Sequence, residues 1–324
     1  MTLPASPEGG TQVGPTGQVP SGPPVGAAFP PATGASPSGT AFQPPAGATP
    51  AAGPLQPATG ATRSRMESGR WVYAIGRLVP RFPDLGAEKE FAQAAGGVAA
   101  NELVGTDQLR AVLSRPENAY LARLMCWVFV ASDVEVFILG CGNTEQATRL
   151  VQALPAPEDT DRTVQAVVGA GGPAHPGDPC AATGLPMVSV DHMLTFTVDE
   201  FLDALIADID DEHKDDARRA ANDLFARLTR RSGNWGLTDE DRARNYAALR
   251  YSQLYHLMFA AQRENKSFLG VEVRASASPA GRQLVAIRLA FRERRTDVLE
   301  RYQCLVDVTD RFPFLAASLA AVYD

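Results

Sequence analysis

Residues 1–62 differ so strongly in composition from the rest of the chain that they limit where a fold can form. Their only charged residue is Glu8, and the others are mainly Pro, Gly, Ala, Ser and Thr. A segment with so little apolar surface cannot offset the entropy that a chain loses on ordering. We therefore predict a disordered Pro/Gly/Ala-rich tail over residues 1–65 and a single domain over residues 66–324.

The charge pattern of the predicted domain bears on its partners. The chain carries a formal net charge of -7, with acidic and basic residues mixed along its length. Nucleic-acid-binding proteins cluster Lys and Arg instead. Even the Arg-rich run 288–301 contains Glu293, Asp297 and Glu300. We therefore expect no nucleic-acid partner.

Membrane and redox signals point to a cytoplasmic protein. There is no secretory signal pattern, and no apolar run approaches the about 18 residues of a membrane span. The four cysteines, Cys126, Cys141, Cys180 and Cys304, are too few and too widely spaced for a disulfide framework. Cys126 and Cys304 lie in apolar runs that are typical of buried thiols.

Strand and helix patterns alternate in the first half of the predicted domain. Strand-like runs rich in β-branched and aromatic residues occupy residues 71–78, 125–130, 134–139, 164–168 and 187–190. The second and third of these form a hairpin signal, because only Ala131, Ser132 and Asp133 separate them. Helical spacing is found over 85–95 and 144–154.

The second half predicts two long helices followed by strands. Thr197 and Glu200 have the spacing of a capping box, and an apolar stripe follows to about Arg230. A second helix begins at Thr238, and an antiparallel meander follows over 268–274, 283–291 and 300–308. We therefore predict an α+β fold in which a mainly antiparallel sheet packs against two long helices.

The stretch 236–255 contains the most distinctive polar set. Asn245 and Tyr246 follow Arg242 by three and four residues, so all three side chains project from one side of a helix. A guanidinium beside an amide and a phenol is suited to bind a peptide backbone or a carboxylate. The alternative is that all three bind the neighbouring loop and close the domain internally.

A loop histidine and cysteine suggest a second kind of site. His175 and Cys180 lie five residues apart in a Gly/Pro-rich loop, and His192 follows twelve residues later. A structural zinc site needs closely spaced ligands, so His175 and Cys180 are the candidate zinc ligands. A thiolate beside a histidine is also a nucleophile, which makes Cys180 with His175 or His192 a candidate catalytic pair.

Acidic residues also cluster on the first long helix. They are Asp208, Asp210, Asp211, Glu212, Asp215 and Asp216. Helical spacing lets them pair with Arg218 and Arg219. We therefore predict a solvated helix face here and no metal site.

Five separated motifs occur in the same order as in a known family. They are WVYAIGRLVPRFPDLGAEKEFAQAAG, ENAYLARLMCWVF, GPAHPGDPC, GLTDEDRARNYAALRY and RRTDVLERYQCLVDVTDRFPFL. Over residues 71–324 the chain resembles the C-terminal domain of PatG-type cyanobactin maturation proteins. In that family this domain of unknown function ends multidomain proteases that act on ribosomally made precursor peptides. Here it stands without subtilisin-like Asp, His and Ser motifs, so the resemblance implies no protease activity and no catalytic residues.

The resemblance implies a role in the modification of ribosomal peptides. We expect a non-catalytic accessory or binding module, without a cofactor, that holds a precursor peptide or a peptide-modifying enzyme. Arg242, Asn245 and Tyr246 are the candidate contacts, and an exposed edge of the C-terminal meander is suited to add a peptide strand. One alternative is a thiol- or zinc-dependent hydrolase or transferase. The other is a dimerisation scaffold, with a second copy of the chain as partner.

Overall fold

The computed structural model describes residues 70–97, 105–159, 162–175, 177–230, 232–278 and 281–323. All of these ranges lie in one structural unit, residues 58–324. The predicted tail, residues 1–65, lies outside the described residues. No helix in the described ranges combines the length and the apolar character needed to span a membrane.

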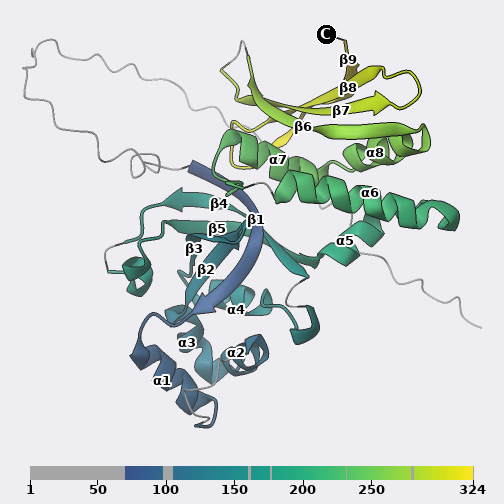
Figure 1. Ribbon diagram of the computed structural model, residues 1–324. Helices are drawn as coiled ribbons and strands as arrows, with labels where there is room; N and C mark the ends of the chain where they lie inside the picture. The colour runs from purple at the N-terminus through teal and green to yellow at the C-terminus, as the bar shows by residue number, and fades with distance from the viewer. Residues whose placement is uncertain are drawn as a thin grey trace, which may run out of the picture. The chain divides into compact units, whose positions relative to one another are not determined.

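The first five strands form a closed barrel of order β1-β2-β3-β5-β4. All neighbours are antiparallel except β3 and β5, which run parallel. Four helices gather at one end of this barrel (Figure 1). The elements of this half are β1 (Arg70–Arg81), α1 (Leu85–Ala94), α2 (Thr106–Leu113), α3 (Ala119–Leu124), β2 (Cys126–Ala131), β3 (Val134–Gly140), α4 (Thr144–Gln152), β4 (Thr163–Gly172) and β5 (Met187–Thr197).

Aromatic residues of β2 and β3 form the centre of the barrel core. Trp127, Phe129 and Phe137 are fully buried, and the rings of Phe129 and Phe137 stack with their centroids 4.9 Å apart. Burial of each such side chain contributes roughly 1.5–3 kcal/mol. The indole N–H of Trp127 donates to the carbonyl of Ala122 at 2.9 Å, which ties α3 to β2. The core therefore extends from the barrel into the helices at its end.

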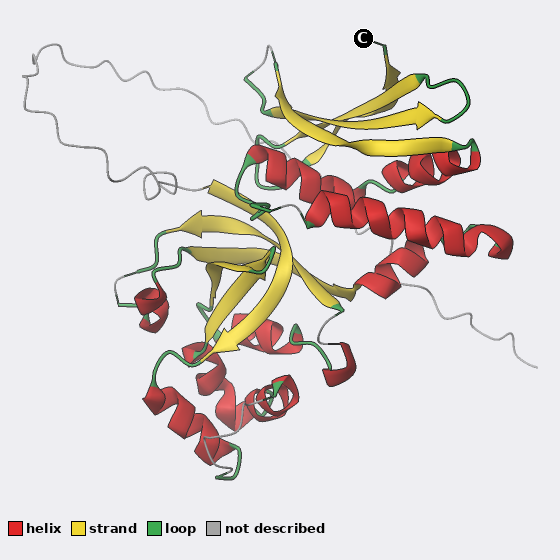
Figure 2. Ribbon diagram, viewed as in Figure 1, coloured by secondary structure: helices red, strands yellow, loops and turns green. Residues whose placement is uncertain are grey.

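The second half is a layer of helices on a four-stranded antiparallel sheet of order β6-β7-β8-β9. Figures 1 and 2 show α6, α7 and α8 along one face of this sheet. Leu224, Leu254, Ile287 and Phe291 belong to the buried cluster between the two layers. The elements are α5 (Val198–Leu205), α6 (Asp211–Thr229), α7 (Asp239–Arg250), α8 (Gln253–Arg263), β6 (Lys266–Ser276), β7 (Leu284–Glu293), β8 (Leu299–Asp307) and β9 (Phe314–Val322).

The predicted α+β class is confirmed, and several local predictions are confirmed with it. β2 and β3 form the hairpin, whose turn residues Ser132 and Asp133 both have positive φ, as a type I′ turn requires. The capping box of Thr197 and Glu200 is present. The two predicted long helices are each divided, into α5 and α6 and into α7 and α8.

The arrangement of the strands differs from the prediction. We expected one mainly antiparallel sheet, whereas the strands form a barrel and a separate sheet, and β9 extends the meander by a fourth strand. The barrel closes through the parallel pair of β3 and β5 and through β1 with β4. These partners are far apart in the sequence, so local patterns carry no signal for their pairing.

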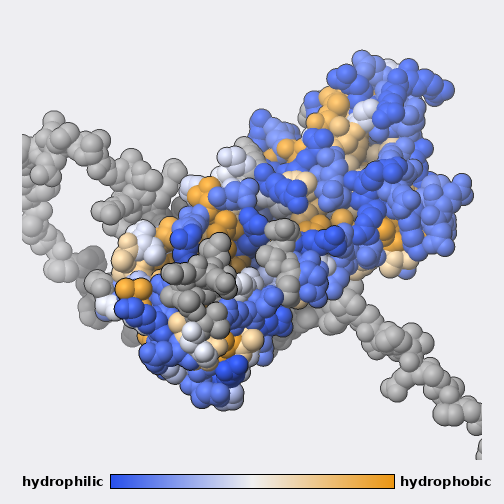
Figure 3. All heavy atoms as spheres, turned by 60° about the horizontal axis from the view of Figure 1, so that its bottom comes forward, coloured by the Kyte–Doolittle hydropathy of each residue, from blue (hydrophilic) through white to orange (hydrophobic). Residues whose placement is uncertain are grey.

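Hydrophobic residues on the barrel end that carries α1–α4 lie in several separate patches among hydrophilic ones (Figure 3). This face therefore resembles an ordinary mixed protein surface.

The two halves meet at the backbone of Tyr73 in β1. β1 pairs with β4 over residues 70–76 and with β2 only over residues 77–81, so no described strand pairs with one edge of residues 70–76. At that edge the N–H of Tyr73 donates to the carbonyl of Gly236 at 3.0 Å. The carbonyl of Tyr73 accepts from Asn245 Nδ2 at 2.8 Å. The Gly236 loop and α7 thus take the place of a strand.

Gly236 is required by this close approach. Its φ is +72°, and a Cβ at this position would lie 2.4 Å from the carbonyl oxygen of Tyr73. Gly233 has a similar φ of +81°, but a Cβ there would meet nothing within 4 Å. The two glycines therefore share a left-handed backbone conformation and differ in their steric surroundings.

We predict that Gly236→Ala lowers the free energy of unfolding by about 3 kcal/mol, because left-handed strain and a steric clash add. Gly233→Ala is the matched control and should cost about 1 kcal/mol from strain alone. Urea denaturation of the two variants measures the difference. Equal losses of unfolding free energy in the two variants would show that the close approach to Tyr73 does not exclude a Cβ at position 236.

Candidate functional site

The three candidate binding residues of the stretch 236–255 lie on α7 and face the interior. Arg242 is 3% exposed and Asn245 is fully buried. Tyr246 is partly buried, and its hydroxyl accepts from the N–H of Leu315 in β9 at 3.1 Å. These contacts agree with the interpretation that the three residues close the domain internally.

Arg242 holds the segment between β8 and β9. Its Nη1 donates to the carbonyl of Val308 at 2.7 Å, and its Nη2 donates to the carbonyls of Asp310 and Arg311. Burial lowers the pKa of this guanidinium, and the nearby carboxylates of Asp239 and Asp310 act in the opposite direction. A buried charge needs such polar partners to offset its desolvation.

Asn245 forms a reciprocal amide pair with Asn234. Asn234 Nδ2 donates to Asn245 Oδ1 at 2.8 Å, and Asn245 Nδ2 donates to Asn234 Oδ1 at 3.1 Å. Asn234 is 3% exposed. The pair fixes the orientation of the Asn245 amide, which also bonds Tyr73.

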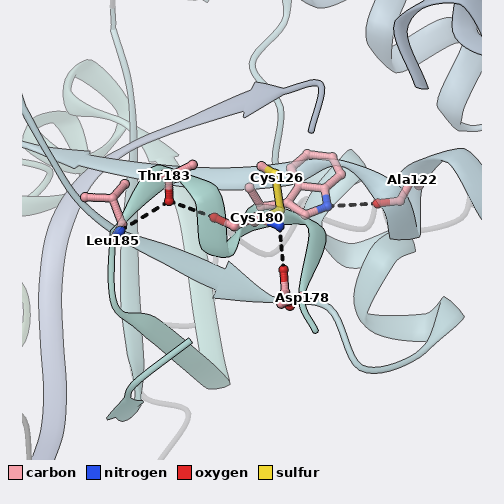
Figure 4. Close-up of a disulfide and its surroundings, with 7 residues drawn as sticks. Ala122, Cys126, Asp178, Cys180, Thr183 and Leu185 are labelled. Atoms are coloured by element: carbon pink, nitrogen blue, oxygen red, sulfur yellow. Dashed lines mark hydrogen bonds between the residues drawn. A yellow bond between two sulfur atoms is a disulfide. The ribbon is translucent and has the colours of Figure 1, made fainter. Parts of the chain in front are cut away.

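The prediction that Cys126 is a free buried thiol is wrong, because Cys126 forms a disulfide with Cys180 (Figure 4). Cys180 lies in the 3₁₀ turn η4 (Pro179–Thr183), and its N–H donates to Asp178 Oδ1 at 2.8 Å. In this form Cys180 has no thiolate to act as a nucleophile or zinc ligand. No local sequence pattern indicates this disulfide, because 54 positions separate the two cysteines.

The other members of the proposed zinc or thiol site do not assemble around Cys180. His175 is exposed, and its Nδ1 accepts from the N–H of Gly177 at 3.1 Å. Over the described ranges, no three His, Cys, Asp or Glu side chains gather in a way that would hold a metal ion. The acidic helix face pairs locally, with Asp211 bonded to Lys214 and Asp216 bonded to Arg219.

The disulfide also bears on the predicted cytoplasmic location. Such bonds persist mainly in oxidising compartments. The location stays a prediction, and the disulfide is an argument against it.

A pocket of about 410 Å³ lies between β5 and α4. Its polar lining comes from both elements. Gln146, Arg149 and Gln152 belong to α4, and Asp191, His192 and Thr195 belong to β5. Leu150, Val190 and Met193 add an apolar wall. A pocket with an apolar wall and a few convergent polar groups is the usual form of a binding site.

The pocket exists because β5 extends beyond the end of its neighbour β3. β5 pairs with β4 along residues 187–197, but with β3 only at residues 187–189. Beyond Ser189, no described strand pairs with β5 on the side of β3. The chain leaves β3 at Gly140 and turns into α4, whose N-cap Asn143 accepts from the N–H of Gln146 at 2.9 Å. α4 thus faces the open stretch of β5.

His192 lies in a positive electrostatic environment within this pocket. Burial lowers the pKa of its imidazole most, and the guanidinium groups of Arg250 and Arg149 lower it further. Asp191, the next residue, is bonded to Arg311 at 3.0 Å. The sequence indicates His192 as a partner of Cys180 but gives no signal for Arg149, because no local pattern connects α4 with β5.

The pocket thus belongs to an α+β domain in which a five-stranded barrel is joined to a helix-covered antiparallel sheet. Residues 211–322 match the family model described as PatG C-terminal. The chain therefore carries a PatG C-terminal-type domain, and the resemblance predicted from the motifs is confirmed.

The same fold occurs in a solved structure titled "PatG Domain of Unknown Function". The TM-score is 0.61 at 18% sequence identity, and the match covers 78% of this chain and 98% of that chain. The likeness therefore extends beyond the helix-and-sheet half into the barrel. A comparison with curated proteins found no match.

We predict that thiol labelling distinguishes three states of the cysteines. Without reductant, iodoacetamide should modify native Cys141 alone, and slowly, because burial raises its pKa. Cys304 is buried with its pKa raised to about 12, so it should react only after unfolding. Cys126 and Cys180 should react only after reduction.

Intact-mass spectrometry counts the modified thiols in each state. Cys141→Ser is the control and should remove the native signal. Labelling of all four cysteines in unfolded, unreduced protein would contradict the Cys126–Cys180 bond.

Proposed function

We propose that this domain is a non-catalytic binding module that holds an extended peptide segment of a partner between β5 and α4. The partner is a precursor peptide or a peptide-modifying enzyme of a ribosomal peptide system, as the family resemblance suggests. The proposal includes no cofactor. The observation that carries it is the open edge of β5 beyond Ser189, which faces α4 across the pocket.

An open strand edge beside a helix suits an extended peptide. A peptide laid along such an edge gains backbone hydrogen bonds, and its alternate side chains point into the neighbouring pocket. The pocket supplies the apolar wall of Leu150 and Met193 for one such side chain, and the amides of Gln146 and Gln152 for polar groups. An apolar wall and convergent amides together support recognition of a peptide.

The C-terminal meander offers a less suitable edge. Its outer strand β9 has two register irregularities against β8. The N–H groups of Leu315 and Leu319 donate to the hydroxyls of Tyr246 and Tyr251, at 3.1 and 2.8 Å. β5 also has a register irregularity, between Val190 and His192, so bulges do not separate the two edges. The occupied donors of β9 do, because strand addition needs free backbone groups. The open stretch of β5 is therefore preferred over β9.

We predict that peptides selected from a phage-displayed random library on the intact protein bind in this pocket. Thr195→Trp places an indole in the pocket from an exposed position of β5. It should weaken binding by about tenfold or more, equivalent to at least about 1.4 kcal/mol. Fluorescence anisotropy with labelled peptides measures the affinity.

Thr296→Trp is the matched control, because Thr296 is exposed and lies in the turn between β7 and β8. It should leave the affinity unchanged. The proposal fails if no library peptide binds, or if both variants bind equally well. Light scattering of the same samples reports whether a second copy of the chain occupies the site instead.

A further inference from the structure

Two basic side chains, Arg149 and His192, line the pocket between β5 and α4. Arg149 lines it from α4, and Arg250, at the end of α7, adds positive potential at His192. Arg311, from the segment between β8 and β9, pairs with Asp191 on β5. Glu145 pairs with Arg149 at 2.6 Å. The guanidinium groups of Arg149 and Arg250 thus both act on His192, while the carboxylates of Glu145 and Asp191 are each paired with an arginine.

Arg149 is placed to receive a ligand. It lines the pocket, and its side chain is 66% exposed although it pairs with Glu145. An exposed ion pair of this kind on one helix contributes little stability, so the guanidinium can exchange Glu145 for another carboxylate at little cost. Arg250, in contrast, is bonded to the buried hydroxyl of Tyr73.

We propose that the pocket binds a carboxylate of the bound peptide, with Arg149 as its cationic partner and His192 as a second one that gains a proton on binding. This rests on the proposed function and names its ligand chemistry, an acidic peptide. The carboxylate would be an Asp or Glu side chain, and the adjacent Gln146 and Gln152 amides are further donors within the same pocket.

The proton uptake follows from the neighbours of His192. In the free protein, burial and the two arginines disfavour the imidazolium. A bound carboxylate places a further negative charge beside the imidazole and so raises its pKa. A ligand that raises a pKa binds the protonated form more tightly. Affinity for an acidic peptide therefore increases as pH falls through the pKa that His192 has in the complex.

Two short peptides of equal length test the proposal. The probes are acetyl-Val-Glu-Val-Glu-Val-amide and its neutral counterpart acetyl-Val-Gln-Val-Gln-Val-amide, titrated into the intact protein with NMR detection. We expect the acidic peptide to bind about tenfold more tightly at pH 6, the range of one charge-assisted contact. We also expect this preference to shrink by pH 8 while the Glu carboxylates stay ionised throughout.

Variants separate the two roles. Arg149→Gln should remove the preference for the acidic peptide. His192→Gln should keep most of the preference and lose its pH dependence, and it also assigns the imidazole resonance. Arg219→Gln is the matched control, because Arg219 is an exposed helical arginine that pairs with Asp216 on α6. It should change neither property.

The outcomes distinguish the two levels of the proposal. If library peptides bind in a manner that Thr195→Trp blocks, but the Glu and Gln probes bind equally, the carboxylate proposal is overturned and the binding module stands. A preference that survives in Arg149→Gln also overturns it. If neither the library nor the probes yield any binding, both proposals fail.

Discussion

The remaining structure depends on how the backbone groups at the open edge of β1, at Tyr73, find hydrogen-bond partners. Buried backbone N–H and C=O groups must find hydrogen-bond partners, and none of the described strands supplies them at this edge. Gly236 and Asn245 bond both groups of Tyr73, and the amide pair with Asn234 holds Asn245 in place. The helix-and-sheet half is thereby joined to the barrel through directional bonds that apolar packing alone would not provide.

The pocket depends on this junction through a series of contacts. Asn245 fixes α7, and α7 brings Arg250 to the vicinity of Tyr73 and His192. From the same helix, Arg242 bonds the carbonyls of the segment that contains Arg311. Arg311 in turn pairs with Asp191 on β5 and lies over the ring of Trp71. The open stretch of β5 is therefore held by groups from the opposite half of the domain.

The sequence predicted the local structure and left the long-range structure open. The capping box at Thr197 and the turn at Ser132 and Asp133 are determined within a few residues, and both were predicted. Closure of the barrel, the Cys126–Cys180 bond and the meeting of Arg149 with His192 each depend on tertiary packing, which no local pattern encodes. Arg242 and Asn245 bind backbone carbonyls of their own chain, which is the internal alternative that the sequence left open.

Hydrogen exchange, measured by mass spectrometry on the intact protein and on Asn245→Ala, tests the central role of the junction most directly. Loss of this buried amide leaves the carbonyl of Tyr73 and Oδ1 of Asn234 without the donor that Asn245 supplies, at a cost of about 1–3 kcal/mol. Exchange should then increase over residues 70–76, over 232–238, and at the more distant segments 187–195 and 308–311. An increase confined to α7 would contradict the account, because it would show that the halves hold together without this contact.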